Sequence, residues 1–409
     1  MKVYLVGGAV RDRLLGISYT EKDWVVVGAT KDQMLSMGFT KVGKDFPVFL
    51  HPETKEEYAL ARIERKAGVG YTGFKCFFDK NVTLEEDLKR RDLTINAMAQ
   101  DESGNIIDPY GGKSDLKNKI IRHVSDSFVE DPLRILRVAR FAAKLYSRGF
   151  FIASETKQLL MTMVRDGELI ALMPERVWME LYKALQGDRP DLFFITLRKM
   201  GALAILFKEI DDLFGVPNPK KWHPEIDTGL HFLMALKEVA KLTHDPKVSF
   251  AVMCHDFGKA STRPSLWPEH HGHDQKGVNI VKNFCKKYNV SNEFRELAVI
   301  VAKEHMLVHK YLELTAKRKL KFLENIDAFR RPIRLEQVLI ACQADRLATN
   351  PKLKDNDFIK YWQACFKEAQ SVDVKKIQNK GFKGKEFGLE LHRQRINKIK
   401  KMDKCIKDP

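Results

Sequence analysis

The residue pattern changes near residue 130, and this change limits the folds open to the chain. Over the first 125 or so residues, apolar runs of strand length such as KVYLVGG (2–8) and KDWVVVG (22–28) alternate with short helical patterns. From about Asp131 onward, the apolar residues recur almost wholly at helical spacing. The pattern therefore predicts an α+β protein, in which a domain with a mixed sheet precedes all-helical domains.

Four segments are expected along the chain. They are a head over 1–125, a helical neck and body over 126–215, a second helical domain over 223–330, and a basic helical tail over 331–409. The stretch FGVPNPKKWHPEID (214–227) carries three prolines, which break helices, and it is the clearest internal boundary.

Two local patterns in the head also carry predictions. Thr30 and Gln33 have the spacing of a capping box, so a helix should begin between them. The stretch IERKAGVGYTGF (63–74) is rich in glycine and basic residues, which is typical of a mobile loop.

The charge of the chain indicates a class of partner. The formal net charge is +17, and no long block of like charge accounts for it. A positive field spread over a folded surface favours a polyanion, most commonly nucleic acid, although charge alone fits a merely basic protein about as well.

Cysteine usage and hydropathy exclude other classes. The six cysteines are scattered without a Cys-x-x-Cys pair, so neither a zinc ribbon nor a disulfide framework is expected. The sequence has no signal-peptide pattern and no apolar run long enough to span a bilayer. We therefore expect a cytoplasmic protein that does not contact membranes.

A glycine pair stands where the first strand should end and the first helix begin. Without Cβ atoms, the backbone at Gly7 and Gly8 can lie against a phosphate beside the free N–H groups of the helix, and Arg11 could clamp the same phosphate. Glu21 and Asp23 alternate at the start of the next strand and so face one side. Carboxylates held this way favour a bound Mg²⁺, and the combination is typical of phosphoryl or nucleotidyl transfer.

The segment EDPLRILRVARF (130–141) has two interpretations. Asp131 stands before a proline and is a good helix N-cap. Asp131 and Arg134 also share a helical face, where the carboxylate can accept from an exocyclic amino group and the guanidinium can donate to a ring acceptor. Cytosine and adenine offer these groups, whereas uracil and guanine present a carbonyl to the carboxylate. Arg137 and Arg140 continue the face and could bind a triphosphate.

Histidines are concentrated in one part of the chain. Nine of the twelve fall between residues 223 and 309, and His270, His271 and His273 crowd one loop. A His-Asp pair ends the apolar run VSFAVMCHD (248–256). The spacing of the His, His-Asp and Asp residues is similar to that of the HD superfamily of metal-dependent phosphohydrolases. The metal ligands implied by this resemblance are His231, His255, Asp256 and Asp345, with His305 as a further candidate. Imidazoles and carboxylates suit a transition metal such as Ni²⁺, Mn²⁺ or Co²⁺, and we expect Ni²⁺.

The head resembles the nucleotidyltransferases of the polymerase-β superfamily, and more narrowly the bacterial class II CCA-adding enzymes. Three family elements are matched by GGAVRD (7–12), RRDLTINA (90–97) and EDPLR (130–134). Glu21 stands where many relatives have aspartate. The order of the motifs and the HD unit extend the resemblance over the whole chain.

The resemblance implies template-independent addition and repair of the 3′-terminal CCA of tRNA, using CTP and ATP. It implies that Glu21 and Asp23 are catalytic ligands of Mg²⁺, and that His255 and Asp256 are catalytic in an HD unit with phosphatase, 2′-nucleotidase or 2′,3′-cyclic phosphodiesterase activity. Relatives often add a third carboxylate from a neighbouring strand, for which Glu57 is a candidate. The implied nucleotide-binding residues are Gly8, Arg11, Arg91, Asp92, Asp131, Arg134, Arg137 and Arg140.

Other functions remain compatible with parts of the sequence. A poly(A) polymerase shares the head, but such enzymes lack an HD unit. An HD nucleotide hydrolase with an inactive head and a non-catalytic RNA-binding protein are further alternatives, and the intact carboxylates of the head argue against the latter. We expect a monomer or a homodimer.

Overall fold

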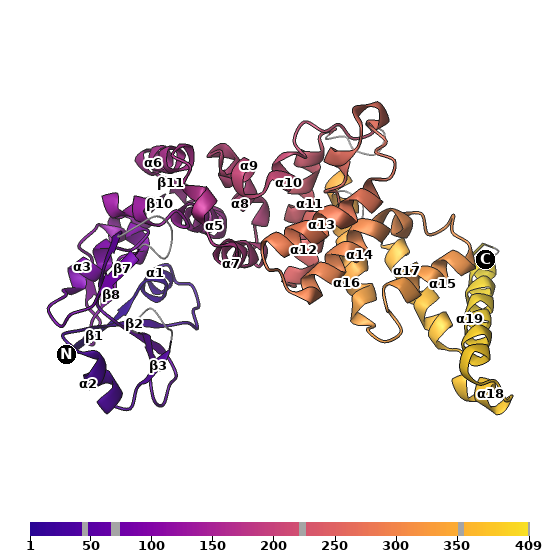
Figure 1. The fold of residues 1–409 in the computed structure, drawn as a ribbon, viewed down its shortest axis with the longest axis horizontal. Helices are drawn as coiled ribbons and strands as arrows, with labels where there is room; N and C mark the ends of the chain where they lie inside the picture. The colour runs from indigo at the N-terminus through magenta and orange to yellow at the C-terminus, as the bar shows by residue number, and fades with distance from the viewer. Residues whose placement is uncertain (43–47, 67–73, 221–225, 351–355, 408–409) are drawn as a thin grey trace. The chain divides into compact units, whose positions relative to one another are not determined.

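The computed structural model describes residues 1–42, 48–66, 74–220, 226–350 and 356–407 (Figure 1). The chain divides into two compact units. The first comprises Met1–Ala184 and Leu192–Phe207, and the second comprises Leu185–Asp191 and Lys208–Pro409. The predicted α+β class is confirmed, because the strands of the main sheet belong to the first unit and the second unit is built from helices.

The head contains a seven-stranded mixed sheet with the order β3-β4-β5-β2-β1-β8-β9. Its strands are β1 (Lys2–Val6), β2 (Asp23–Val27), β3 (Thr40–Val42), β4 (Val48–Leu50), β5 (Glu57–Leu60), β8 (Ala99–Gln100) and β9 (Ile106–Ile107). Strand β2 pairs antiparallel with β1 and parallel with β5. The register aligns Val6, Asp23 and Glu57 across these three strands. These three residues are the last residue of β1 and the first residues of β2 and β5. The glycine turn follows directly after Val6.

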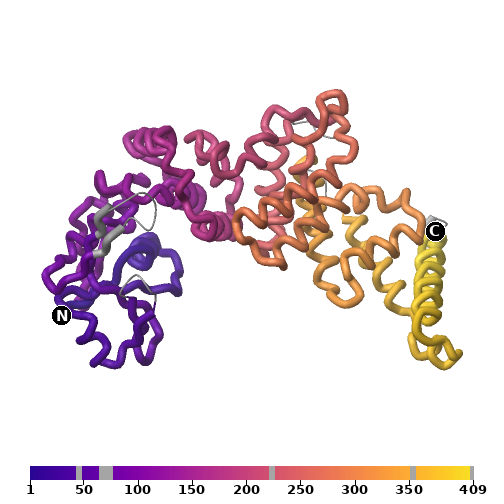
Figure 2. The backbone as a smooth tube through the Cα atoms, in the orientation of Figure 1, coloured from indigo at the N-terminus to yellow at the C-terminus, as the bar shows by residue number. Residues whose placement is uncertain are grey.

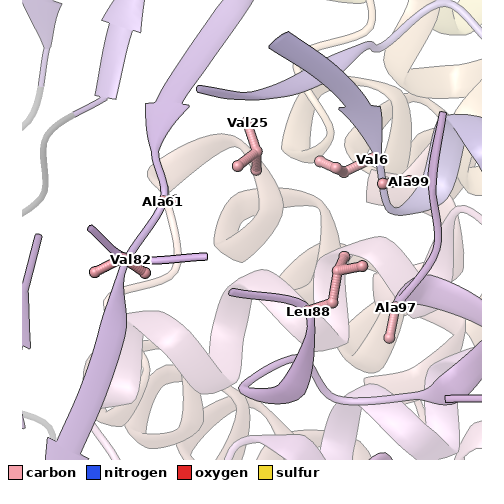
Figure 3. Packing of buried hydrophobic residues seen from close by; sticks show 7 residues of the cluster. All are labelled: Val6, Val25, Ala61, Val82, Leu88, Ala97 and Ala99. Atoms are coloured by element: carbon pink, nitrogen blue, oxygen red, sulfur yellow. The ribbon is translucent and has the colours of Figure 1, made fainter. Parts of the chain in front are cut away.

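Both faces of this sheet are packed. On one face, Val6, Val25 and Leu88 belong to a buried cluster that includes residues of β1, β2 and helix α3 (Leu84–Lys89), as Figure 3 shows. Asp23 lies two residues before Val25 in the same strand, so it is directed to this face. The opposite face carries a second cluster with Met34 of helix α2 (Lys31–Ser36).

The capping box predicted for α2 is confirmed. The Gln33 amide donates to Thr30 Oγ1 at 3.3 Å, and the Thr30 amide donates to Gln33 Oε1 at 2.9 Å. The loop predicted over 63–74 is wrong at its ends, where β6 (Ile63–Lys66) pairs with β7 (Phe74–Phe77). A four-residue strand with one apolar residue gives no period-2 signal, so this pairing could not be recognised. Residues 67–73 of the expected loop lie outside the described residues.

One helix lies between β1 and β2, and the other helices and two short paired strands of this region follow the sheet in the chain. They are α1 (Gly8–Leu14), α4 (Gly112–Asn118), β10 (Ile120–Ile121), α5 (Arg134–Leu145), β11 (Phe151–Ile152), α6 (Ser154–Arg165), α7 (Pro174–Leu185), α8 (Pro190–Lys199) and α9 (Ala202–Leu206). Helix α5 buries Ile135, Leu136 and Ala139 on its apolar side. Arg134 is buried with these apolar residues, whereas Arg137 and Arg140 are only partly buried.

The second unit is a set of packed helices. They are α10 (Lys208–Asp211), α11 (Thr228–Leu242), α12 (Pro246–Cys254), α13 (His273–Lys287), α14 (Asn292–His309), α15 (Ala316–Asn325), α16 (Ile333–Thr349), α17 (Asp357–Gln370), α18 (Val374–Asn379) and α19 (Gly384–Lys407). Helix α11 packs along α16, and α12 packs on both α14 and α16. Helix α19 lies against α15 and α17 (Figure 2). Among the described residues, no helix has the length and apolarity needed to cross a membrane.

Candidate functional sites

The glycine turn is shaped by a close approach of Arg91. Gly7 has a φ of +71°, and a Cβ atom at this position would stand 3.0 Å from Arg91 Nη1. Any other residue would be strained there and would push Arg91 aside. Arg91 also forms an ion pair with Asp87, because its Nη2 donates to Asp87 Oδ2 at 3.2 Å. The turn and the arginine of the RRDLTINA motif thus form one surface.

Arg11 is engaged with its own motif and the neighbouring one. Its Nε donates to Asp12 Oδ1 at 2.7 Å, and its Nη1 donates to Asn96 Oδ1 at 2.6 Å. The guanidinium is buried and lies 5.0 Å from the ring centre of Phe141. Arg11, which was predicted to bind phosphate, thus connects α1 to the RRDLTINA segment through these hydrogen bonds.

The two predicted metal carboxylates lie at the start of β2. Asp23 is its first residue, Glu21 precedes the strand by two positions, and both side chains are exposed. Although Asp23 is exposed, partial desolvation raises its pKa, and Glu21 acts in the same direction while Arg91 opposes it. Glu57, also exposed, is the register partner of Asp23 in β5. This all-oxygen donor set beside a glycine turn fits Mg²⁺.

Asp92 connects the RRDLTINA segment to α5. One of its oxygens accepts from Asn96 Nδ2 at 3.1 Å, and the other accepts from Arg137 Nε at 2.7 Å. Burial by itself would raise the pKa of Asp92, but the charge of Arg137 and the hydrogen bonds hold it well below its usual range. The carboxyl group of Asp92 is therefore ionised at neutral pH, and it fixes the orientation of the Arg137 side chain.

Asp131 caps a turn and also accepts from an arginine of α7. Its Oδ1 accepts from the Leu133 amide at 3.1 Å, in the turn that leads into α5. The helix itself begins at Arg134, with Leu133 at the N-cap position that the sequence assigns to Asp131. Arg176 donates to both carboxylate oxygens of Asp131, at 3.2 and 2.8 Å.

The other arginines of this segment also have defined partners. Arg134 is buried and donates to the Ser127 and Arg90 carbonyl oxygens at 2.9 and 2.5 Å. Arg140 donates to Glu180 Oε2 at 2.6 Å. Sequence reasoning missed Arg176 and Glu180 on α7, although their i, i+4 spacing on an amphipathic helix was a usable signal.

A cluster of imidazoles and carboxylates lies within the second unit. His231 lies on α11, His255 directly follows α12, and Asp345 lies on α16. Asp345 Oδ1 lies 2.9 Å from His231 Nε2 and 3.7 Å from His255 Nε2. Asp256 Oδ2 lies 3.2 Å from His255 Nε2. The structure thus brings together the four HD residues identified in the sequence.

The carboxylate of Asp256 fits a metal cation. Among the described residues, neither of its buried oxygens accepts a hydrogen bond with acceptable geometry, although Lys259 Nζ lies 2.8 Å from Oδ2. Burial would lower the pKa of His255, but Asp256 outweighs this effect and raises the pKa to about 10. A carboxylate that stabilises a neighbouring positive charge this strongly, with Nε2 atoms facing it, provides the ligands and charge for a divalent metal.

His273 and His309 also belong to the cluster, although they were not identified as ligands from the sequence. Asp256, His273 and His305 form a second buried group of candidate ligands, and His309 Nε2 lies 2.8 Å from Asp345 Oδ2. The i, i+4 spacing of His305 and His309 on α14 was a signal for a shared face. Burial, with a contribution from the nearby His255, lowers the pKa of His305 to about 3, so its imidazole is neutral.

The two other loop histidines lie outside this group. His270 is buried and bonds through its two ring nitrogens to Thr262 Oγ1 at 2.8 Å and to the Pro217 carbonyl at 2.7 Å. His271 is exposed. Of the three loop histidines, His273 is thus the one that belongs to the candidate metal centre.

Family models match three segments of the chain. Residues 3–122 match the "Poly A polymerase head domain", and residues 149–214 match the "Probable RNA and SrmB- binding site of polymerase A". Residues 228–350 match the "HD domain", a span that includes α16 and Asp345 beyond the boundary expected at residue 330.

Full-length relatives share about half of the residues. A "Multifunctional CCA protein" of Vibrio campbellii is 54% identical over 402 residues, which cover 98% of this chain and 99% of that protein. A protein of the same description from Legionella pneumophila is 51% identical, with 97% and 96% covered.

Solved structures share the fold at lower identity. The Bacillus stearothermophilus CCA-adding enzyme in complex with CTP has a TM-score of 0.65 and 23% identity, and the match covers 97% of this chain and 88% of that one. A CCA-adding enzyme with ATP has a TM-score of 0.64 and 21% identity, with 97% and 86% covered. The likeness extends over both units.

Proposed function

Because the chain belongs to the family of multifunctional CCA proteins, we propose that it adds and repairs the 3′-terminal CCA of tRNA and that its HD domain hydrolyses phosphate esters. The family resemblance deduced from the motifs is confirmed by the near full-length relatives. The chain is an enzyme with a nucleotidyltransferase head and an HD domain, and both kinds of domain depend on metal ions.

The head carries out the transfer reaction with residues of the glycine turn, the RRDLTINA segment and α5. Bound Mg²⁺ would be held by Glu21 and Asp23, with Glu57, the register partner of Asp23, as a further candidate ligand, and would stabilise the attacking and leaving oxygens. Gly8 and Arg91 line the turn where the triphosphate binds, and Arg11 supports it from beneath. Asp92 keeps Arg137 in place, and Arg140 is held by Glu180.

Asp131 and Arg134 select the base. The carboxylate of Asp131 accepts from the exocyclic amino group of cytosine or adenine and repels the carbonyl of uracil or guanine. Arg176 orients the carboxylate through two hydrogen bonds. Arg134, three residues after Asp131, has its guanidinium oriented by hydrogen bonds to two backbone carbonyls. The register of Asp23 with Glu57 beside the Gly7 turn is the observation that carries the assignment of the head.

The partners follow from the charge and from the matched RNA-binding segment. The substrate is the acceptor end of tRNA, bound mainly through its phosphates by a protein of net charge +17. CTP and ATP are the nucleotide substrates. The cytoplasm, where tRNA is processed, is the compartment of action.

The HD domain removes phosphate from nucleotides or from damaged tRNA 3′ ends. Its metal, for which the mixed imidazole and carboxylate ligands favour Ni²⁺, would bind His231, His255, Asp256 and Asp345 and activate water for attack on phosphorus. Lys259, 2.8 Å from Asp256 Oδ2, adds positive charge at the place where a phosphate group would bind.

One assay tests the proposed transfer reaction. The protein is incubated with tRNA that lacks its 3′ CCA, with Mg²⁺ and with each labelled nucleoside triphosphate in turn. We expect incorporation of CMP and then AMP, with little UMP or GMP. Long runs of AMP would instead indicate a poly(A) polymerase, and no incorporation together with hydrolysis of 2′,3′-cyclic AMP would indicate an HD hydrolase with an inactive head.

A further inference from the structure

We propose that Lys183 of α7 is a further catalytic residue of nucleotidyl transfer, and that its ammonium group binds the pyrophosphate that leaves the incoming nucleotide. This inference rests on the proposed transfer of CMP and AMP. It adds a residue that lies outside the glycine turn, the RRDLTINA segment and the EDPLR segment. Its basis is the face of α7 on which Lys183 lies, together with the partners of the other cations around the site.

One face of α7 is fixed by the packing of the helix. Three buried apolar residues, spaced i, i+4 and i+7, anchor the helix in the core, and they are Val177, Leu181 and Ala184. Arg176, Glu180 and Lys183 each directly precede one of these anchors, so they have the same spacing and share the adjacent face. The contacts of Arg176 and Glu180 therefore show where this face is directed.

The contacts along this face follow the nucleotide from its base to its phosphates. Arg176 donates to Asp131, the proposed base-reading residue. One turn later, Glu180 accepts from Arg140, a proposed triphosphate ligand, at 2.6 Å. Lys183 follows after a further turn, about 10 Å along the helix axis from Arg176 at 1.5 Å per residue. The face thus continues beyond the base toward the reacting end of the nucleotide.

The charge of Lys183 acts on the carboxylates at the start of β2. Burial raises the pKa of Asp23, Arg91 opposes this effect, Glu21 adds to it, and Lys183 opposes it. Arg91 and Lys183 therefore act on Asp23 from two different elements, the RRDLTINA segment and α7. Carboxylates that bind metal in a transferase stand beside the phosphates of its nucleotide, so a cation in this place faces phosphate oxygens.

Lys183 differs from the neighbouring arginines in its partners. Arg91 forms an ion pair with Asp87, and Arg137 forms one with Asp92. The side chain of Lys183 is exposed, and among the described residues it forms no ion pair or hydrogen bond. An oxygen of the substrate can therefore accept from its ammonium group without breaking an ion pair within the protein.

The transfer reaction places new negative charge on the leaving group. The 3′ oxygen of the tRNA forms a bond to the α-phosphorus, and the bond from that phosphorus to the oxygen bridging to the β-phosphate breaks. The electron pair of the broken bond stays on the pyrophosphate, and the proton of the 3′ hydroxyl passes to solvent. An ammonium group that donates to pyrophosphate oxygens stabilises this charge as it develops and lowers the barrier to transfer. Lys183 keeps its proton throughout.

Steady-state kinetics of the full-length protein test the role of Lys183. Transfer of CMP to tRNA that lacks its 3′ CCA is measured in Lys183→Met, with inorganic pyrophosphate as product inhibitor. We expect kcat/KM for CTP to fall by roughly a hundredfold and the inhibition constant of pyrophosphate to rise by about tenfold. Lys183→Arg should restore most of both quantities, because it keeps the charge. The Kd for tRNA and the ratio of CMP to UMP incorporation should not change.

Controls separate this role from the alternatives. Lys199→Met, at an exposed lysine in the last turn of α8, should behave as the parent protein does. Lys183→Gln repeats the test if circular dichroism shows that Lys183→Met is unfolded. Parent-like inhibition by pyrophosphate in the folded variants would overturn the role of Lys183 and leave the proposed function intact, and weaker tRNA binding would then assign Lys183 to an RNA phosphate. No incorporation of CMP by the parent protein would overturn the proposed transfer function as well.

Discussion

Arg176 of α7 donates to both carboxylate oxygens of Asp131, the residue that we propose reads the incoming base. The same carboxylate accepts from the Leu133 amide, so it has a local role in the turn before α5 and a longer-range role through α7. Both side chains are about one-quarter exposed, with 22% for Asp131 and 25% for Arg176, so a nucleotide can reach them. The pair therefore connects nucleotide selection to a helix with no recognised motif.

Replacing Asp131 by asparagine should alter selectivity more than stability. Asparagine caps about as well as aspartate, and a partly exposed ion pair is worth roughly 0–1 kcal/mol, so the melting temperature should change little. Its amide can turn a donor toward uracil or guanine. UTP or GTP incorporation should therefore rise relative to CTP and ATP on the same tRNA. The exposed Asp126 provides the control Asp126→Asn, and unchanged discrimination in Asp131→Asn would restrict Asp131 to capping.

Arg176→Ala should weaken discrimination without removing the proposed base-reading residue. The carboxylate keeps its bond from Leu133 but loses two charge-assisted hydrogen bonds, so its orientation is less defined. We expect the ratio of kcat/KM for CTP to that for UTP to fall by about tenfold, which corresponds to roughly 1.4 kcal/mol. Arg165→Ala, at an exposed position of α6, is the control. Arg176→Lys should restore little of the discrimination between CTP and UTP, because lysine cannot form the bidentate pair.

The two active sites should fail independently. Asp23→Asn should abolish nucleotide addition and leave hydrolysis of 2′,3′-cyclic AMP intact, whereas Asp256→Asn should do the reverse, because each change removes metal ligands from one site. Asp32→Asn, exposed on α2, should affect neither reaction. Both activities are measured on the same preparations, with circular dichroism to verify folding. Loss of both activities in either variant with an intact fold would contradict the two-site assignment.

Asp92 should stabilise the protein in a pH-dependent manner. Its pKa is lowered in the folded state, so its contribution is present above the unfolded value of about 4 and is lost as the pH falls below it. Asp92→Asn should cost about 2 kcal/mol in the free energy of unfolding at pH 7, less than for a wholly buried pair, because Arg137 is one-third exposed. Urea denaturation at pH 7 and pH 3 should show the difference shrinking at low pH. A constant difference would mean that packing, and not charge, accounts for the effect.

Binding of tRNA should depend steeply on salt. If about six to ten phosphates are neutralised, the slope of log Kd against log salt concentration should amount to several units. The affinity is measured by fluorescence titration with labelled tRNA at salt concentrations from about 50 to about 200 mM, the range over which such complexes lose affinity. A nearly flat dependence would show that the net charge of +17 serves another purpose.

The sequence predicted residues whose role depends on local backbone geometry. Gly7, with its positive φ, and the Thr30–Gln33 capping box follow from short-range rules, and both are present in the structure. Long-range partners carry no such signal. Arg176 lies 45 positions from Asp131, so only the packing of α7 and α5 reveals their contact. His273 was visible as a histidine in a loop, but its carboxylate partner depends on the Gly258 contact with α13.

The division of the chain into two units has a consequence for gene architecture. Leu185–Asp191 belongs to the second unit, while Leu192–Phe207 returns to the first, so the backbone passes from one unit to the other three times. A stop codon after residue 207 would leave seven residues of the second unit attached to the first, and a start at Lys208 would lack them. A gene that encodes every residue of one unit and none of the other therefore cannot arise from a single break between Ala184 and Lys208.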